Sequence, residues 1–516
     1  MAAYSPPKFV LDAGKSNVGA MFHRRVPAHP DHLALIDHDR TRSYSELDET
    51  SSRLANGLIA LGLKPGDRIG LLARNCLEYV EVELAAAKAG FIVACLNWRL
   101  GAREMQHCIR LVEPAVVIAQ AELVSLLDRL DLPSHLRLVI GKDYESLVAK
   151  GSPFMPEAVI DPEDGLVILY TSGTTGLPKG ALISHRAMLA RAASYVSEFA
   201  IPIGDNFVAW APYYHMVSTD QTIATLLRGG TVHIVDGFQP DRLIDILEAV
   251  SMRWFVLMPG TVAAFTEALR VRKARPKGLG LVGAMADLIP REEIAAVTRY
   301  LNVPYVNTFG STETGLPPAT GSTIPVGVAP TDMSKRQSAF CDIRLVDWED
   351  MDVPNGQPGE IAFRGPTLFS GYWNADEANA RDFRGGWFHM GDILRRNPGG
   401  QLDFVDRVKY LIKSGGENIY PAEIEQVLLQ DDRIRVAVVV RRSDEKWGEV
   451  PVVFIVRGDD KLSEQDVLER CHQELPSYKR PKAVFFIDDP DLPRSTTGKI
   501  QRHELEARLQ HQSASQ

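Results

Sequence analysis

The chain has 516 residues, a formal net charge of −9 and a hydrophobic content of 45%. This length is too great for one hydrophobic core, so we expect two to four domains. The acidic balance argues against nucleic acid as a partner, and no uncharged apolar run reaches the ~18 residues of a membrane span. Since the N-terminus also lacks a signal-like apolar core, these properties predict a cytoplasmic protein without a transmembrane segment.

The cysteines are scattered along the chain and odd in number. They are Cys76, Cys95, Cys108, Cys341 and Cys471, and none forms a C-x-x-C pair. A disulfide framework or a zinc site would need paired or closely spaced thiols. We therefore expect small buried thiols in a reducing compartment.

The first third of the chain alternates apolar strands with helices. A small hairpin is predicted at 33–40, and Ser43 with Glu46 forms a capping box that opens a helix ending near Gly62. Strands are expected at 67–72, 91–95, 114–119 and 136–140, with a helix over 76–88. This alternation predicts an α/β fold with a mostly parallel sheet.

A loop rich in glycine and hydroxyl residues follows the apolar run 166–169, which predicts a buried strand. It reads Thr171-Ser172-Gly173-Thr174-Thr175-Gly176-Leu177-Pro178-Lys179-Gly180, and we expect a helix over 181–195 after it. Glycines let backbone N–H groups face an anion, while the hydroxyls and the lysine add donors and charge. The loop therefore predicts a polyphosphate ligand. It does not fit the Walker pattern, because glycine follows Lys179, so a P-loop NTPase is disfavoured.

Two later segments carry weaker signals. His215 follows aromatic residues and a strand expected to end at Pro212, and a lone histidine in such surroundings is usually a packed side chain. Asp220 is interpreted as a helix N-cap. The G-x-G-x-x-G match at 278–283 follows polar, basic residues instead of a strand, so we interpret it as chance and expect the strand at 279–282.

The segment 305–314 places an aromatic ring, several hydroxyl groups and a carboxylate at the end of another predicted strand. It reads Tyr305-Val306-Asn307-Thr308-Phe309-Gly310-Ser311-Thr312-Glu313-Thr314. Magnesium binds few carboxylates and takes its other ligands from phosphate oxygens and water, so Glu313 is a candidate magnesium ligand.

These motifs and their order resemble the adenylate-forming superfamily of AMP-dependent synthetases and ligases, in its acyl-CoA synthetase branch. The resemblance spans about 30–505 and includes Gly391-Asp392, Asp406-Arg407 and the loop Pro493–Ile500. It implies a large N-terminal adenylation domain over 1–408, with mostly parallel sheets, and a small mobile α+β domain over 409–516 with its hinge at Lys409. The block 359–373 is interpreted as mainly structural.

The resemblance also implies the site residues. Thr171, Lys179, Glu313 and Lys499 are the expected catalytic residues, with Glu313 as the magnesium ligand. The residues assigned to ATP or AMP are Thr171, Ser172, Gly173, Thr174, Thr175, Gly176, Lys179, Thr308, Phe309, Gly310, Ser311, Thr312, Asp392, Arg407 and Lys499. Those assigned to the acyl group are His215, Met216, Thr219, Gly283, Ala284, Gly310 and Leu316. Those assigned to CoA and the thioester step are Lys413, Gly415, Gly416, Glu417, Tyr478 and Arg480.

The expected activity is that of an acyl-CoA synthetase, which makes acyl-AMP and pyrophosphate from ATP and a carboxylic acid and then displaces AMP with CoA. Met216 stands where members that activate amino acids usually carry Asp, so the resemblance implies a plain carboxylic acid: a medium- or long-chain fatty acid, or an aromatic or alicyclic acid. One alternative is an enzyme that loads a separate carrier protein, and a remote one is a nucleotide-binding protein without turnover. The expected partners are the acid, ATP and CoA, with Mg²⁺ as cofactor, and a homodimer is considered.

Overall fold

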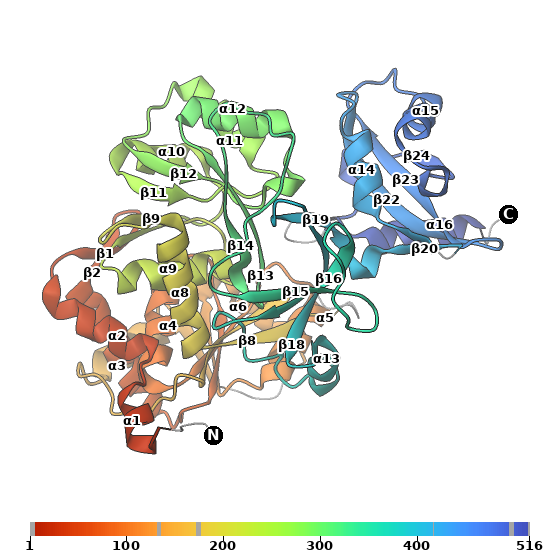
Figure 1. Cartoon of the computed structure of the whole chain (residues 1–516). Coiled ribbons are helices and arrows are strands. Elements are labelled where there is room, and N and C mark those ends of the chain that lie inside the picture. The colour runs from red at the N-terminus through yellow and green to blue at the C-terminus, as the bar shows by residue number, and fades with distance from the viewer. Residues whose placement is uncertain (1–5, 132–135, 172–176, 416, 495–499, 514–516) are drawn as a thin grey trace. The chain divides into compact units, whose positions relative to one another are not determined.

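The structure is a computed structural model that describes residues 6–131, 136–171, 177–415, 417–494 and 500–513, and these form two compact units (Figure 1). Unit 1 comprises Met1–Asp342 and Arg364–Gly386, and unit 2 comprises Ile343–Phe363 and Trp387–Gln516. The fold is the mixed α/β fold that the sequence predicts, with several mostly parallel sheets in the larger unit. The domain boundary and hinge at 408/409 stay predictions, because compactness alone does not show which segment moves.

One sheet of unit 1 has the strand order β6-β5-β3-β4-β7-β8. Its neighbouring strands are parallel except for the antiparallel pair β7 and β8 at one edge. Apolar residues from both faces of this sheet are buried, as a parallel sheet covered by helices requires. The strands are β3 (Arg68–Leu72), β4 (Ile92–Cys95), β5 (Val116–Gln120), β6 (Leu136–Ile140), β7 (Gly165–Thr171) and β8 (Lys179–Ser184).

Unit 1 contains two further sheets, with the orders β2-β1-β10-β9 and β11-β12-β13-β14. In each sheet one edge pair is antiparallel, β1 with β2 and β13 with β14, and the other pairs are parallel. The strands are β1 (Leu33–Asp37), β2 (Arg40–Ser43), β9 (Asn206–Ala209), β10 (Thr231–Ile234), β11 (Met252–Phe255), β12 (Leu279–Val282), β13 (Tyr305–Ser311) and β14 (Gly315–Ile324).

Helices of unit 1 cover these sheets, and their starts follow local capping signals. The predicted capping box is confirmed, since the Ser43 side chain accepts from the backbone N–H of Glu46 and the Glu46 side chain accepts from that of Ser43. The helices are α1 (Lys8–Ala13), α2 (Val18–Arg25), α3 (Tyr44–Ala60), α4 (Leu77–Ala89), α5 (Ala102–Val112), α6 (Val124–Asp128), α7 (Asp143–Lys150), α8 (His185–Phe199), α9 (Met216–Leu227), α10 (Pro240–Ala249), α11 (Val262–Arg272), α12 (Arg291–Leu301) and α13 (Asp376–Asp382).

The glycine-rich loop joins two antiparallel strands, so the expectation of a helix directly after it is wrong. Lys179–Ser184 forms β8, which pairs with β7, and α8 begins only at His185. Ser184 marks the true start, because its side chain accepts a hydrogen bond from the backbone N–H of Ala187. The apolar residues before Ser184 satisfy their backbone groups by pairing with β7, which the sequence pattern does not reveal.

In unit 2, β15, β16, β18 and β19 belong to one sheet, in which β18 pairs antiparallel with β16 and with β19. A second sheet has the order β21-β20-β23-β22, and β24 pairs with β23 in parallel. The elements of unit 2 are β15 (Asp342–Val346), β16 (Pro358–Arg364), β18 (Trp387–Arg396), β19 (Leu402–Arg407), β20 (Ile412–Ser414), β21 (Glu417–Ile419), β22 (Ile434–Asp444), β23 (Gly448–Arg457), β24 (Val484–Phe486), α14 (Pro421–Leu428), α15 (Glu464–Glu474) and α16 (Arg502–Ser513), while β17 (Phe383–Arg384) belongs to unit 1.

The expectation of small buried thiols is borne out. All five cysteines are buried and free of disulfides. Among the described residues, no helix is both long enough and apolar enough to cross a membrane.

Candidate active site

The two ends of the predicted phosphate loop lie opposite each other. Thr171 ends β7, Lys179 begins β8, and the two residues are paired across this antiparallel ladder. The loop residues assigned to phosphate between them, Ser172, Gly173, Thr174, Thr175 and Gly176, lie outside the described residues. The hairpin therefore fixes where the loop leaves and re-enters the sheet.

Lys179 is held by an aromatic ring and a carboxylate. Its Nζ lies 3.5 Å from the centroid of the Tyr372 ring and 3.3 Å from Oδ2 of Asp382. Burial lowers the pKa of Lys179, whereas the negative charge of Asp382 acts in the opposite direction. The ring face and the carboxylate thus stabilise the ammonium form in a half-buried place.

Tyr372 also contacts the candidate magnesium ligand. Its phenol donates a hydrogen bond of 2.9 Å to Oε1 of Glu313, which lies in the turn between β13 and β14. Burial, and then the charge of Glu313, raise the pKa of Tyr372, so its phenol remains protonated and can donate near neutral pH. Tyr372 therefore joins Lys179 and Glu313 in one cluster.

The place of Tyr372 follows from backbone pairing. The N–H of Trp373 donates to the carbonyl of Gly180 at 2.8 Å, and the N–H of Leu182 donates to the carbonyl of Gly371 at 3.0 Å. Residues 371–373 lie in the block that was interpreted as mainly structural. Their pairing with β8 places Tyr372 against Glu313. Tyr372 was not among the predicted site residues. The signal that could have pointed to it is its place between Gly371 and Trp373 in the block 359–373.

Glu313 suits a magnesium ion that takes most of its ligands from phosphate. Among the described residues, no group of three or more His, Cys, Asp or Glu side chains gathers to hold a metal. A hard cation on a nucleotide needs only one or two carboxylates in addition to phosphate oxygens and water. A carboxylate oriented by Tyr372 meets that requirement.

The other residues assigned to ATP in this part line the end of β13. Thr308 is buried, and its hydroxyl accepts from the backbone N–H of Met285 at 3.2 Å. Gly310 must lack a side chain, because a Cβ there would overlap the carbonyl of Gly315. Phe309, Ser311 and Thr312 complete the segment that leads to Glu313.

The residues assigned to the acyl group come from α9 and from the ends of β12 and β13. His215 is the N-cap of α9, and its ring accepts from the N–H of Val217 at 3.4 Å. Met216 and Thr219 are buried in the first turns of this helix. The expectation for Asp220 is wrong, since it lies inside α9, where the N-cap is already His215.

Gly283 has a structural requirement of its own. Its φ is +86°, and a Cβ would overlap the ring of Tyr305, whose hydroxyl donates to the Ala284 carbonyl at 3.0 Å. Leu316 is buried at the start of β14. Tight packing alone therefore explains the small residue at 283, and the acyl-site roles of Gly283, Ala284 and Leu316 stay predictions.

Unit 2 brings together two of the residues assigned to ATP or AMP. Asp392 on β18 and Arg407 on β19 are partners in the sheet, and Nε of Arg407 lies 3.0 Å from Oδ1 of Asp392. The hinge candidate Lys409 follows in the short 3-10 helix η4 (Val408–Tyr410), with its Nζ 4.9 Å from the centroid of the Tyr410 ring. Lys499 lies outside the described residues.

The residues assigned to CoA come from the β20–β21 hairpin and from the 3-10 helix η5 (Ser477–Lys479), two elements in contact. Lys413 and Glu417 are exposed, and Gly415 has a φ of +58° at a point where a Cβ would approach the Trp447 ring to 2.6 Å. Tyr478 is 40% exposed, and Arg480 donates to the carbonyl of Leu475 at 2.9 Å. Gly416 lies outside the described residues.

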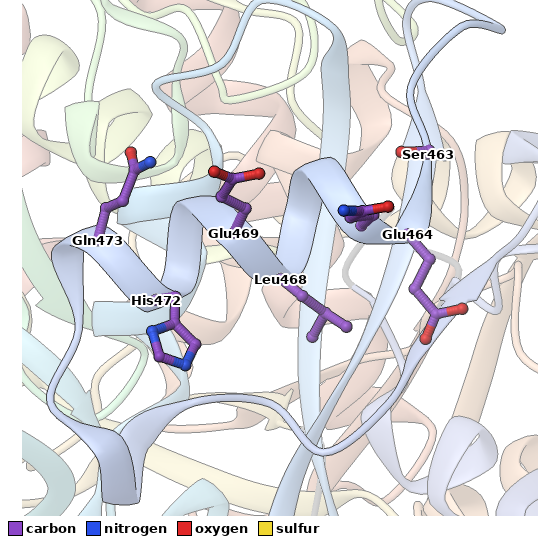
Figure 2. A pocket seen from close by; sticks show the side chains of 7 residues that line it. Ser463, Glu464, Leu468, Glu469, His472 and Gln473 are labelled. Carbon is purple, nitrogen blue, oxygen red and sulfur yellow. The ribbon is translucent and has the colours of Figure 1, made fainter.

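An open hollow of about 750 Å³ lies on α15 of unit 2. Figure 2 shows its side chains leaving the helix on different sides, with His472 and Leu468 on one and Glu469 and Gln473 on the other. It contains none of the predicted site residues, although Nε2 of His472 lies 3.0 Å from Nη1 of Arg480. We therefore interpret this hollow as space between surface side chains of α15 and not as part of the candidate site.

Comparison with known proteins places these observations in a family. Residues 22–373 match the family described as AMP-binding enzyme, and residues 423–499 match its C-terminal domain. An indoleacetate–CoA ligase of Aromatoleum aromaticum is 32% identical over 93% of this chain and 96% of its own, and a feruloyl-CoA synthase of an Amycolatopsis species is 32% identical over 94% and 98%. A solved fatty acyl CoA synthetase of Mycobacterium tuberculosis superposes with a TM-score of 0.78 at 26% identity, over 96% of this chain and 99% of that one.

Proposed function

Because the chain belongs to the family of AMP-binding enzymes and is an AMP-forming acid–thiol ligase, we propose that it converts an aromatic or fatty acid into its CoA thioester, with Lys179 and Glu313 facing the nucleotide phosphates. One observation carries the assignment of residues. Lys179, Tyr372 and Glu313 come from three separate segments of unit 1 and form a contiguous cluster beside the described ends of the phosphate loop.

The chemistry explains why such a cluster is needed. A carboxylate oxygen attacks the α-phosphorus of ATP, the bond from that phosphorus to pyrophosphate breaks, and acyl-AMP forms. An anion approaches a polyanion in this step, and each close pair of charges is worth about 4 kcal/mol at an effective dielectric near 20. Lys179 would bind the phosphates, and Tyr372 would keep Glu313 oriented. Magnesium held by Glu313 and phosphate oxygens would supply further positive charge.

The second step transfers the acyl group to sulfur. The thiol of CoA loses its proton, the sulfur attacks the acyl carbonyl carbon, and AMP leaves with the electron pair of the broken mixed anhydride bond. We assign Lys413, Glu417, Tyr478 and Arg480 to this step and Lys499 to the first. The lid domain would begin at the hinge Lys409, so that one site serves both steps in turn.

A panel of acids tests this function directly. Purified protein receives ATP, Mg²⁺ and an aromatic, an alicyclic, a medium-chain or a long-chain acid, and pyrophosphate and thioester are measured separately. We expect both products, with an aromatic acid giving the highest kcat/KM, because two relatives of 32% identity are named for indoleacetate and ferulate. Pyrophosphate release without a CoA thioester, combined with loading of an added acyl carrier protein, would support the carrier-loading alternative. No pyrophosphate with any acid would contradict enzymatic activity.

The homodimer and the cytoplasmic location stay predictions. Light scattering of the purified protein tests the homodimer.

A further inference from the structure

Arg191 on α8 is a buried cation that the proposed function does not use. Only 2% of its side chain is exposed, and the same is true of Asp220 on α9, whose Oδ2 lies 3.2 Å from Nη1 of Arg191. Helices α8 and α9 lie side by side (Figure 1). Burying two charges between helices costs desolvation free energy, so a buried ion pair adds little net stability. We therefore looked for a role of this pair other than stabilising the fold.

The rest of the guanidinium holds the turn that carries Glu313. Nη2 donates to the carbonyls of Thr312 at 2.9 Å and of Glu313 at 3.1 Å, while Nε donates to the carbonyl of Thr367 at 3.0 Å. The planar fork thus fixes the backbone of the candidate magnesium ligand, whose side chain is fixed separately by Tyr372. Gly315 at the start of β14 allows this approach, because a Cβ there would lie 2.9 Å from Cγ of Arg191.

The other side of the pair belongs to the helix that begins the predicted acyl site. Asp220 lies one turn after Met216, and the adjacent Thr219 has its hydroxyl 2.6 Å from the carbonyl of Tyr213 and 3.2 Å from Oε1 of Glu83. A hydroxyl has one hydrogen, and the nearer acceptor is the carbonyl. Burial raises the pKa of Glu83 to about 8, so this carboxyl is mostly neutral near pH 7, and Asp220 is the carboxylate that pairs with Arg191.

We propose that Arg191 is a positioning residue that ties the Glu313 turn to helix α9 through Asp220, and so fixes the spacing between the metal-binding carboxylate and the acyl-binding helix. The inference rests on the proposed function, since it takes Glu313 as the magnesium ligand and α9 as part of the acyl site. The carboxylate of the acid must lie close to the α-phosphorus before it can attack, and this distance depends on the spacing between the Glu313 turn and α9. Neither of these two segments sets the spacing alone.

The first test separates the positive charge of Arg191 from the planar arrangement of its N–H donors. Arg191→Lys keeps a cation beside Asp220 but cannot donate to three carbonyls at once, and the pair Arg191→Met with Asp220→Asn removes both charges together, so that neither is left buried alone. We expect both variants to fold and to bind MgATP about tenfold more weakly in calorimetry without acid, because partners that orient a metal ligand typically contribute this much. Pyrophosphate release should need correspondingly more Mg²⁺.

A second buried pair provides the matched control. Lys88 Nζ lies 2.7 Å from Oδ1 of Asp48, away from the predicted site residues. The double variant Lys88→Met with Asp48→Asn should lower thermal stability and leave MgATP affinity unchanged. If both Arg191 variants bind MgATP as the wild type does and show the same Mg²⁺ dependence, the pair has only a structural role and the proposal is overturned.

Two further variants complete the test. Asp220→Asn retains the carbonyl bonds of Arg191 and should raise the KM for the acid several-fold with unchanged MgATP affinity; an unchanged KM would refute the link to α9. Glu313→Gln separates this inference from the function on which it rests. Should Glu313→Gln show normal Mg²⁺ dependence, the metal role of Glu313 and the positioning role of Arg191 both fail. Should it be impaired while the Arg191 variants behave normally, the positioning role alone fails.

Discussion

The candidate residues of unit 1 and unit 2 lie in different environments. Lys179 and Glu313 are partly buried and already engaged by Asp382 and Tyr372, whereas Lys413, Glu417 and Tyr478 are exposed on a short hairpin and a 3-10 turn. Charges interact more strongly away from water and are less screened by salt there. Under the proposed assignments, unit 1 would offer a preorganised phosphate site, whereas each contact from unit 2 would be weaker on its own.

Lys499 provides the strongest test of this contrast, because it belongs to unit 2 and is predicted to act in the adenylation step. Lys499→Ala should reduce acid-dependent pyrophosphate release about 1,000-fold, since one lost electrostatic contact in a transition state can cost that much. Thioester formation from preformed acyl-AMP should be unchanged. An equal loss in both half-reactions would contradict the division of labour between the steps.

Lys409 tests whether the two steps use different poses of the lid. Proline at this position restricts the backbone, so Lys409→Pro should leave pyrophosphate release near normal. CoA consumption should fall on the order of 100-fold, the cost of misplacing reacting groups. Parallel assays of the two products measure the ratio, and a proportionate decrease in both would argue against a hinge at this residue.

Tyr372→Phe examines the preorganised cluster of unit 1. Loss of the phenol frees Glu313 and should weaken MgATP binding about tenfold, with a matching rise in the Mg²⁺ requirement. Tyr144→Phe is the matched control, because the Tyr144 hydroxyl donates to Oε2 of Glu81 at 2.6 Å in a buried pair elsewhere in unit 1. The control should lose stability only. Equal MgATP affinities in the two variants would remove Tyr372 from the site.

Arg480 tests the expectation that contacts from unit 2 are individually weak. Arg480→Ala should raise the KM for CoA by up to about fivefold, the range of a surface ion pair, and the difference should shrink as salt is added. The KM values for the acid and ATP should stay as in the wild type. A salt-independent effect would indicate that this arginine acts through packing against α15 instead of through charge.

Glu83 gives the smallest expected effect on activity and a distinct effect on stability. Burial raises its pKa from 4.5 to about 8. Between these values the folded protein retains a proton that the unfolded chain has lost, so the free energy of unfolding should decrease by about 1.4 kcal/mol per pH unit as pH rises through this window and level off above it. Glu83→Gln, whose amide does not titrate, should remove this slope in denaturant titrations. A slope that persists in the variant would assign it to other groups.

Local patterns in the sequence were sufficient to identify the chemistry. The loop after 171, the turn at Glu313 and the dipeptides Gly391-Asp392 and Asp406-Arg407 are short segments whose order resembles that of one family, and the alternation of strands and helices predicted the fold class. Capping at Ser43 and the buried strand before Thr171 were equally readable, because both depend on adjacent residues.

The tertiary structure decided what joins these motifs. Tyr372 and Glu313 are 59 positions apart, and Arg191 reaches carbonyls 121 and 122 positions away. Strand β8 likewise replaced the expected start of a helix, because its pairing with β7 satisfies backbone groups that a helix would otherwise satisfy internally. The amino-acid sequence thus determined the family and the fold class, and it predicted which groups handle a nucleotide and an acid. Only long-range packing and hydrogen bonding decided which residues orient them, since such contacts depend on distances that local residue patterns do not encode.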